Sequence, residues 1–279
     1  MSKIATYVFF DLQTTGLPRT WHGEVRIIEL CMLAVKRLQL TDLSHSAEKP
    51  QIQFKFKMYF DPQKDLHPMS SVLTKLSKDL LKDEPEFNTD VIDAMNSFLS
   101  CLEKPVCLVG HNAFIFHFPL LQYHINKLKV SLLGDIMCSD SIYTFYDILE
   151  PETYNWPKEI DGRSADDESE SSEDDELLDR DGYLNKLIKR TKYYKVGKKN
   201  FKKLRRSKFY GLPRFKPHAS YKLKDIYRRI DGGHLEKNES EDQCMMIMKI
   251  ALARIDEFID WVDRNHSPFS QVPIIKMFD

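Results

Sequence analysis

The pattern of apolar and polar positions predicts strands in the first half of the chain. Residues 4–10 (IATYVFF) are mostly β-branched or aromatic and end at Asp11, and residues 26–40 are largely apolar, which is typical of central strands. Residues 51–60 (QIQFKFKMYF) alternate between apolar and polar, the period-two pattern of a half-buried or edge strand. A further short strand is predicted at residues 106–109.

Helical spacing occurs between and after these strands. The segments concerned are residues 68–81, 90–102, 118–127, 222–229 and 242–263. The last segment is strongly apolar and predicts one long buried helix. Strands followed by alternating helices and strands predict an α/β domain with a mixed sheet.

The composition narrows the class of protein. The 279 residues are 42% hydrophobic and 30% charged, which suits one large domain or two small ones and excludes collagen-like, disulfide-scaffold and wholly disordered chains. The five cysteines are scattered, include no CxxC pair and predict buried free thiols in a reducing compartment. Without a signal peptide or an apolar run of about 18–20 residues, we expect a soluble protein of the cytoplasm or nucleus with no membrane tether.

The net charge is only −1, but the charges are segregated between residues 151 and 218. The acidic block, residues 166–181, carries ten acidic residues and one arginine. The basic block, residues 186–216, carries fourteen lysines and arginines and no acidic residue. Because such like-charge runs cannot build a core, we predict a single domain, residues 1–279, with a charged and disordered insertion at 151–218.

The basic block also has aromatic residues such as Phe201 between its cations. Lysines that neutralise phosphates and aromatics that stack on bases are typical of segments that bind single strands. A nuclear-import signal and a solvated linker that folds back on the acidic block are the alternatives. The candidate nucleic-acid contacts of this block are Lys198, Lys199, Lys202, Lys203, Arg205 and Arg206.

Polar residues that could bind a metal ion or take part in catalysis lie where predicted strands end. Asp11 and Gln13 are two positions apart, so both side chains point to one side of the sheet and could reach one metal ion. Gly16 allows the backbone to turn tightly against a substrate. Further along the chain, His117 lies at a predicted helix start and Asp242 opens the last predicted helix. Each signal alone is weak.

In this order and spacing, the segments resemble the DEDDh 3′→5′ exonucleases, and among them the three-prime repair exonuclease (TREX) family. FFDLQTTGLP is similar to a first motif that is usually FxDxETTGLP, and CLVGHNAFIFHFPLLQ is similar to the second motif. SYKL and the C-terminal WVD and SPF segments also resemble the family. The resemblance covers all but residues 151–218 and implies an RNase H-like (DnaQ-type) fold, a mixed central sheet flanked by helices.

The resemblance implies a catalytic set of four carboxylates, which hold two Mg²⁺ (or Mn²⁺) ions, and a histidine that takes a proton from water. Asp11 matches the first carboxylate, but Gln13 and His117 stand where the family has the second and third. Asp242 matches the fourth, and the position five residues before it is Lys237 rather than histidine. The nearest upstream histidine is His234. Asp11 and Asp242 remain as the implied metal ligands.

Two hypotheses follow from these departures. The first is a pseudo-exonuclease that binds DNA 3′ ends, or RNA, with little or no hydrolysis, because the lost negative charges weaken metal binding and such losses cost orders of magnitude in rate. The second is an active, metal-dependent 3′→5′ DNA exonuclease with an atypical site, in which His234 is the base. Engineered substitution at Gln13 and His117 is a further alternative.

The resemblance also implies binding residues and an assembly. Near the first two motifs, the implied nucleic-acid contacts are Thr14, Gly16, Leu17, His111 and Asn112, although His111 could instead be a structural hydrogen bonder. Pairing of the edge strand 51–60 between two copies would give a homodimer, unless Lys55 and Lys57 protect that edge.

Overall fold

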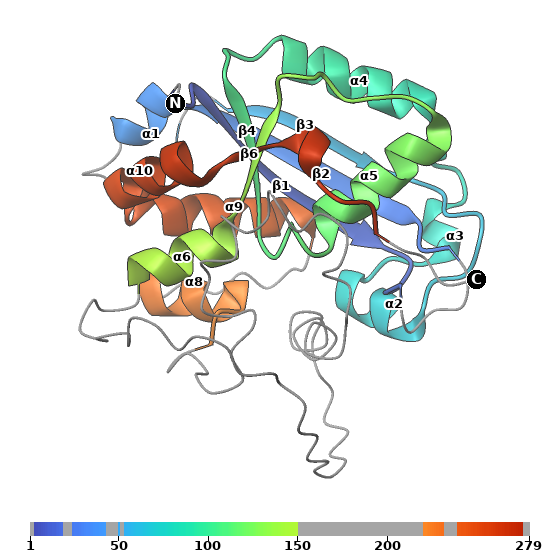
Figure 1. Ribbon diagram of the computed structural model, residues 1–279. Coiled ribbons are helices and arrows are strands. Elements are labelled where there is room, and N and C mark those ends of the chain that lie inside the picture. Colours follow the sequence, from blue (N-terminus) through green and yellow to red (C-terminus); the bar gives the residue numbers. More distant parts are fainter. Residues whose placement is uncertain are drawn as a thin grey trace, which may run out of the picture.

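The computed structural model describes residues 3–18, 24–42, 50, 53–149, 220–231 and 239–275. The predicted insertion and its two charged blocks lie outside these ranges. The described residues form one six-stranded sheet in the order β3-β2-β1-β4-β5-β6 (Figure 1). The strands are β1 (Thr6–Thr14), β2 (Ile27–Lys36), β3 (Phe54–Tyr59), β4 (Val106–Gly110), β5 (Met137–Asp140) and β6 (Ser267–Pro268).

The sheet is mixed, as the sequence predicts. The strand β1 pairs antiparallel with β2, which pairs antiparallel with β3. On its other side β1 runs parallel to β4, and β4 runs parallel to β5. β6 closes the far edge antiparallel to β5. The parallel strands β1 and β4 place the two predicted motifs at the same end of the sheet.

Helices cover both faces of the sheet (Figure 1). They are α1 (Arg37–Thr41), α2 (Pro68–Thr74), α3 (Lys78–Leu81), α4 (Thr89–Ser100), α5 (His117–Leu128), α6 (Ser141–Leu149), α8 (Leu223–Asp231), α9 (Ser240–Leu252) and α10 (Ile255–Asn265). Phe9 of β1 packs against Phe258 of α10 with ring centroids 6.4 Å apart, whereas Phe10 packs against Phe118 of α5 at 5.5 Å. Odd-numbered positions of β1 therefore face α9 and α10, and even-numbered positions face α5.

Burial on both faces explains the composition of β1. All nine of its residues are buried, so the strand is largely apolar rather than alternating. Each fully buried aromatic such as Phe9 or Phe10 contributes roughly 1.5–3 kcal/mol relative to an exposed side chain. Against this background Asp11 and Gln13 are exceptional, because they are polar residues at 1% and 5% exposure. Their polar atoms must therefore find hydrogen-bond partners within the protein.

Three predictions of element extent are wrong. The segment 68–81 is two helices, because Lys75 takes a left-handed φ of 58° after α2 and the Ser77 side chain caps α3. The segment 242–263 is also two helices, since Arg254 between α9 and α10 has a non-helical backbone conformation (φ −141°, ψ 49°). The predicted strand 26–40 ends at Lys36, where α1 begins.

The prediction of buried free thiols is confirmed for four of the five cysteines. Cys31, Cys107, Cys138 and Cys244 are buried and only Cys101 is exposed, and all of them are free thiols. Across the described ranges, the helices are too short or too polar for any of them to cross a bilayer.

Candidate active site

Asp11 lies at the centre of the candidate site and is held by two side chains of its own chain. The Gln13 amide nitrogen Nε2 donates to Asp11 Oδ2 at 2.8 Å. His117, at the start of α5, places its Nε2 3.5 Å from the other carboxylate oxygen, Oδ1. The Asp11 and His117 side chains are only 2% and 1% exposed. The structure thus brings together three of the predicted residues, and both Asp11 oxygens face a nitrogen of this chain.

The helix α9 carries Asp242 to the same face of the sheet. α9 packs against β1 and β2, and the Cys244 thiol lies 3.6 Å from the Cys31 carbonyl oxygen. Cys31 is directly opposite Asp11 in the pairing of β1 with β2, and opposite residues share a face. Burial and the charge of Glu239 raise the pKa of Asp242. Within the part of the chain that the structure describes, its Oδ2 is buried without a hydrogen-bond partner.

A buried glutamate, Glu29, lies beside Gln13 on the same face of the sheet, and the sequence analysis missed it. Glu29 of β2 is opposite Gln13 and is 1% exposed. Its Oε1 accepts the Ser240 backbone N–H at 3.2 Å and lies 3.5 Å from Lys57 Nζ. Glu29 therefore caps the first turn of α9 from the sheet, which fixes the helix that carries Asp242. The period-two pattern of β3 gave no signal for this contact, because it places Lys57 on the polar face of the strand.

The two lysines of the edge strand are engaged within the chain. Lys57 Nζ donates to Glu239 at 2.9 Å and lies 3.6 Å from Glu241, and Lys55 forms an ion pair with Glu241. Burial lowers the pKa of Lys57, but hydrogen bonds to Glu239 and Tyr59 and the charge of Glu29 raise it above its usual range overall. Lys57 therefore stays protonated. Both lysines bind α9 instead of guarding the open edge of β3.

His111 is placed as a structural hydrogen bonder. It is 5% exposed, its Nδ1 lies 2.9 Å from Ser141 Oγ and its Nε2 lies 3.0 Å from the Tyr221 carbonyl oxygen. Its ring also stacks on Phe145 with centroids 6.4 Å apart. His111 thereby connects the end of β4 to α6 and to the start of α8, and both ring nitrogens contact the protein.

The loop from β4 to α5 is organised around Asp140, which the sequence analysis did not single out. Its Oδ2 accepts the Phe114 N–H at 3.0 Å and its Oδ1 accepts the Ile142 N–H at 3.1 Å. Backbone N–H groups of Asn112 and Ala113 also bond to this carboxylate. Burial raises the Asp140 pKa to about 7, although these four N–H groups oppose the shift. Asp140 therefore shapes the loop that leads to His117.

The backbone of this loop is tight. Asn112 has a left-handed φ of 55°. A Cβ on Gly110 would come within 2.7 Å of the Ala113 Cβ, so the chain requires glycine where β4 ends. The predicted HN pair thus lies in a turn whose geometry is fixed by glycine before it and by Asp140 beside it.

The segment Thr14–Leu17 is anchored at both ends. Thr14 Oγ1 donates to the Gly16 carbonyl oxygen at 2.8 Å, and Ser70 Oγ of α2 donates to the Thr14 carbonyl oxygen at 2.7 Å. The Thr15 N–H donates to the Arg26 carbonyl oxygen at 2.9 Å, and this bond joins the two ends of the connection between β1 and β2. Thr14 and Gly16 are buried, and Leu17 is half-buried.

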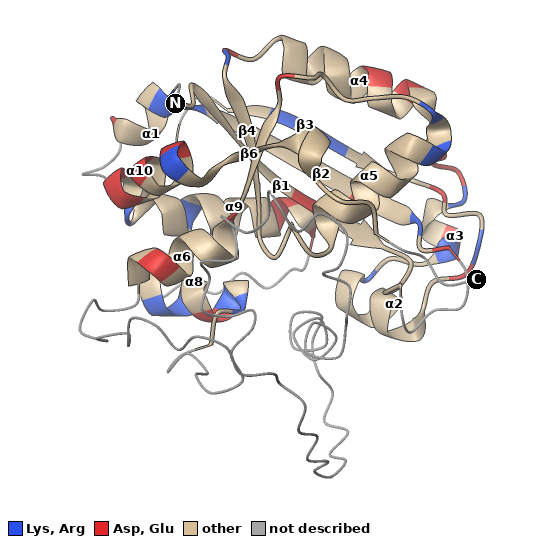
Figure 2. Ribbon diagram, in the orientation of Figure 1, with Lys and Arg blue, Asp and Glu red and all other residues tan. Residues whose placement is uncertain are grey.

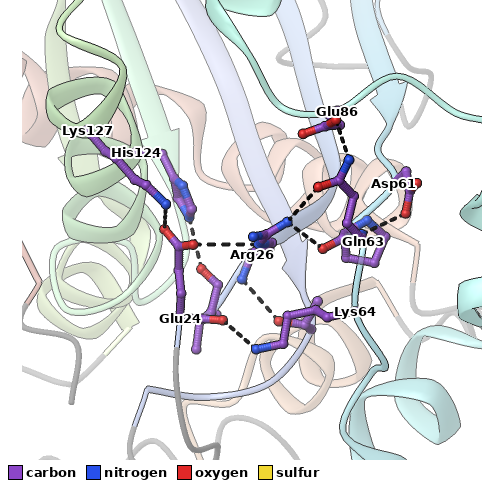
Figure 3. A network of polar contacts seen from close by, with 11 residues as sticks. Glu24, Arg26, Asp61, Gln63, Lys64, Glu86, His124 and Lys127 are labelled. Atoms are coloured by element: carbon purple, nitrogen blue, oxygen red, sulfur yellow. Dashed lines mark hydrogen bonds and ion pairs between the residues drawn. The ribbon is translucent and has the colours of Figure 1, made fainter. Parts of the chain in front are cut away.

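A polar network links the end of the β1–β2 connection to α5 and to the β3–α2 connection (Figure 3). Glu24 forms an ion pair with Lys127 at 2.6 Å, and its carbonyl oxygen accepts from Lys64 at 2.9 Å. Arg26 donates to the Pro62 carbonyl oxygen at 2.8 Å. His124 Nε2 lies 2.9 Å from the Val25 carbonyl oxygen, and burial lowers its pKa to about 4. The network positions the predicted nucleotide contacts on a rigid support.

The remaining predicted site residues lie outside the described residues. They are His234, Lys198, Lys199, Lys202, Lys203, Arg205 and Arg206.

The comparisons with known proteins agree with this geometry. Residues 8–131 match the model of the exonuclease family RNase_T. This part of the chain is thus similar to the exonuclease family. It is 34% identical over 146 residues to three prime repair exonuclease 2 of Mus musculus, an alignment that takes in 50% of this chain and 61% of that protein. With three-prime repair exonuclease 1 of Bos taurus the identity is 34% over 149 residues, or 50% of this chain and 46% of that protein. The chain thus spans less than two thirds of the length of either relative.

Solved structures share the fold at low identity. The nuclease domain of 3′hExo, a DEDDh family member bound to rAMP, matches with a TM-score of 0.53 at 13% identity and covers 92% of this chain and 94% of that one. The E. coli ExoI–ssDNA complex matches with a TM-score of 0.53 at 14% identity, over 92% of this chain and 42% of that one. These likenesses confirm the predicted RNase H-like fold.

The donor set of the candidate site does not fit the pair of Mg²⁺ ions that the resemblance to DEDDh exonucleases implies. Mg²⁺ prefers oxygen ligands, and two adjacent divalent ions need several carboxylates. Here an amide and an imidazole face Asp11, and Glu29 faces Lys57. Among the residues with described positions, no three or more His, Cys, Asp or Glu side chains are grouped so as to hold a metal ion.

Proposed function

We propose that this protein binds DNA 3′ ends through its exonuclease domain and is catalytically impaired or inactive. One observation carries the proposal: the Asp11 carboxylate is enclosed by the Gln13 amide and the His117 imidazole. Neither side chain supplies the negative charge that would hold divalent ions against the scissile phosphate. Loss of such ligands costs orders of magnitude in rate. Binding of a strand end depends on other features and is retained.

The bound end would lie where β1 and β4 end. Thr14, Gly16, Leu17 and Asn112 provide backbone and side-chain contacts on the anchored segments described above. Lysine and arginine positions alternate with aspartate and glutamate positions along the described elements, which offers no long basic run for a phosphate backbone (Figure 2). The basic block supplies it in this proposal, since its cations neutralise phosphates and its aromatics stack on bases. The substrate class is single-stranded or 3′-ended DNA, and a preference for RNA would revise it.

One observation favours an active exonuclease with an atypical site. Among the described residues, the buried Asp242 Oδ2 atom has no hydrogen-bond partner. A cation could bind beside this oxygen. In that alternative Asp11 and Asp242 hold a single Mg²⁺ or Mn²⁺ ion and His234 is the base.

An assay of degradation separates the two functions. We expect the wild-type protein and the Asp11→Ala variant to degrade 5′-labelled single-stranded DNA at the same near-background rate, with Mg²⁺ or Mn²⁺ and with protein in excess over DNA. The reason is that the wild-type site, with Gln13 and His117 beside Asp11 instead of carboxylates, already lacks the charge needed to hold divalent ions, so Asp11→Ala has no catalysis left to remove. Electrophoresis of the products measures the rate. A ladder of shortened DNA products formed by wild type and not by Asp11→Ala would refute the hypothesis of an inactive protein.

We also propose a homodimer formed through β3. This strand is an edge of the sheet as described, Phe54 is 44% exposed on it, and both of its lysines are engaged by α9. A strand edge whose lysines form ion pairs within their own chain favours antiparallel pairing with a second copy. Sedimentation equilibrium should give twice the chain mass of 32.8 kDa, and a single-chain mass at micromolar concentration would contradict the dimer.

A further inference from the structure

We infer that Lys57 is the resident cation of the candidate site and that the site is built to function without a divalent ion. The inference rests on the proposed binding function, which it deepens. It also adds to the misfit of the donor set, because an ammonium group held among carboxylates lies two strands from Asp11 on the same face of the sheet.

The register of the sheet places Lys57 in line with Asp11. Asp11 of β1 is opposite Cys31 of β2, and Cys31 is opposite Lys57 of β3. Residues directly opposite one another share a face, and neighbouring strands are about 4.7–4.9 Å apart. The three side chains therefore point toward α9 in one row. The next row on the same face is Gln13, Glu29 and Tyr59.

Lys57 is held among carboxylates rather than extended into solvent. Its side chain is only 17% exposed, and its Nζ lies 3.5 Å from Glu29, 2.9 Å from Glu239 and 3.6 Å from Glu241. The Nζ is also 5.2 Å from the centre of the Tyr59 ring. A buried ammonium with three carboxylates around it stays charged, because losing the proton would leave several acids unpaired. The position of the charge is thus fixed by the fold.

The field of this cation reaches the candidate site. Two of its carboxylate partners, Glu239 and Glu241, lie at the N-terminal end of α9, which also carries Asp242. Glu29, which Lys57 neutralises, is directly opposite Gln13. A divalent ion brought between Asp11 and Asp242 would be repelled by Lys57 and would find Asp11 already engaged. Both effects oppose metal binding.

Titration with Mn²⁺, observed by electron paramagnetic resonance of the free ion, tests the inference. Only binding that Asp11→Ala abolishes counts as binding at the site, which removes any contribution of acidic residues elsewhere. We expect Lys57→Gln to bind Mn²⁺ there at least about tenfold more tightly than wild type, equivalent to about 1.4 kcal/mol. The matched control is Lys55→Gln, because Lys55 lies on the same face of the same strand but pairs with Glu241 and is 46% exposed. This control should behave like wild type.

Equal Mn²⁺ affinities of Lys57→Gln and wild type, with melting curves that show both folded, would overturn the inference. If Lys57→Gln does not fold, the wild-type protein decides alone: Mn²⁺ binding at the site tighter than about 1 mM overturns it, and weaker binding supports it. This readout contains no nucleic acid, so it fails or succeeds separately from the proposed function. A protein that binds no DNA refutes the function, whereas one that binds DNA only with Mn²⁺ present refutes the inference.

Discussion

Replacing residues 186–216 with a glycine–serine linker of equal length is expected to weaken binding of single-stranded DNA at least about tenfold, or about 1.4 kcal/mol. The block carries fourteen lysines and arginines and no acidic residue, whereas the described elements have mixed charge. Each phosphate contact releases counterions, and roughly 4 or more contacts at about 0.7 each should give the wild type a steep dependence of log affinity on log salt. Fluorescence anisotropy over a salt series measures both quantities, and the variant should show a flattened slope.

The acidic block supplies the matched control. Replacing residues 166–181 in the same way removes ten acidic residues and should tighten binding, because these residues compete with phosphates for the basic block. Unchanged affinity and unchanged salt slope after loss of the basic block would show that the block does not touch nucleic acid. Nuclear import or a protein partner would then be its better explanation.

The fold was predictable because its signals are local and repeated. The apolar run of β1 and the alternation of β3 required only the two-residue period of strands, and the structure has both strands in one mixed sheet. The extents of helices were less predictable. Lys75 and Arg254 interrupt apolar helical patterns by backbone conformation alone, and neither residue type signals a break. Tertiary packing decides such positions, which propensity does not describe.

The candidate site was predictable where its residues follow strand ends. Asp11, Gln13 and His117 were singled out from their order along the chain, and the structure places them in contact. Glu29 was not singled out, because its importance arises from a contact with Ser240, 211 positions away. The same holds for Lys57, which the sequence analysis considered only as a guard of the edge strand. Long-range partners of a buried charge are not visible in a single sequence.

Asp140→Ala is expected to lower the free energy of unfolding by at least about 3 kcal/mol, because loss of the carboxylate would leave several buried N–H groups without an acceptor. The backbone N–H groups concerned are those of Asn112, Ala113, Phe114 and Ile142. The loop they form leads directly to His117. A more mobile loop should therefore also broaden the NMR signals of the His117 ring, which contacts Asp11. Urea unfolding followed by circular dichroism measures the stability, and NMR of the His117 ring reports on the site.

The isosteric variant Asp140→Asn removes the titration of this residue, and the loss of one of its two acceptor oxygens adds a cost that does not depend on pH. Burial raises the Asp140 pKa to about 7 from an ordinary value of 3.8, so the folded protein favours the protonated acid. The stability this provides is fully present below about pH 4 and is lost as the pH rises through 7, an effect on the order of 4 kcal/mol. Asparagine does not titrate, so the stability of Asp140→Asn relative to wild type should increase between pH 5 and pH 8. A constant difference over that range would mean that the four N–H groups, rather than burial, control Asp140 and keep it ionised throughout.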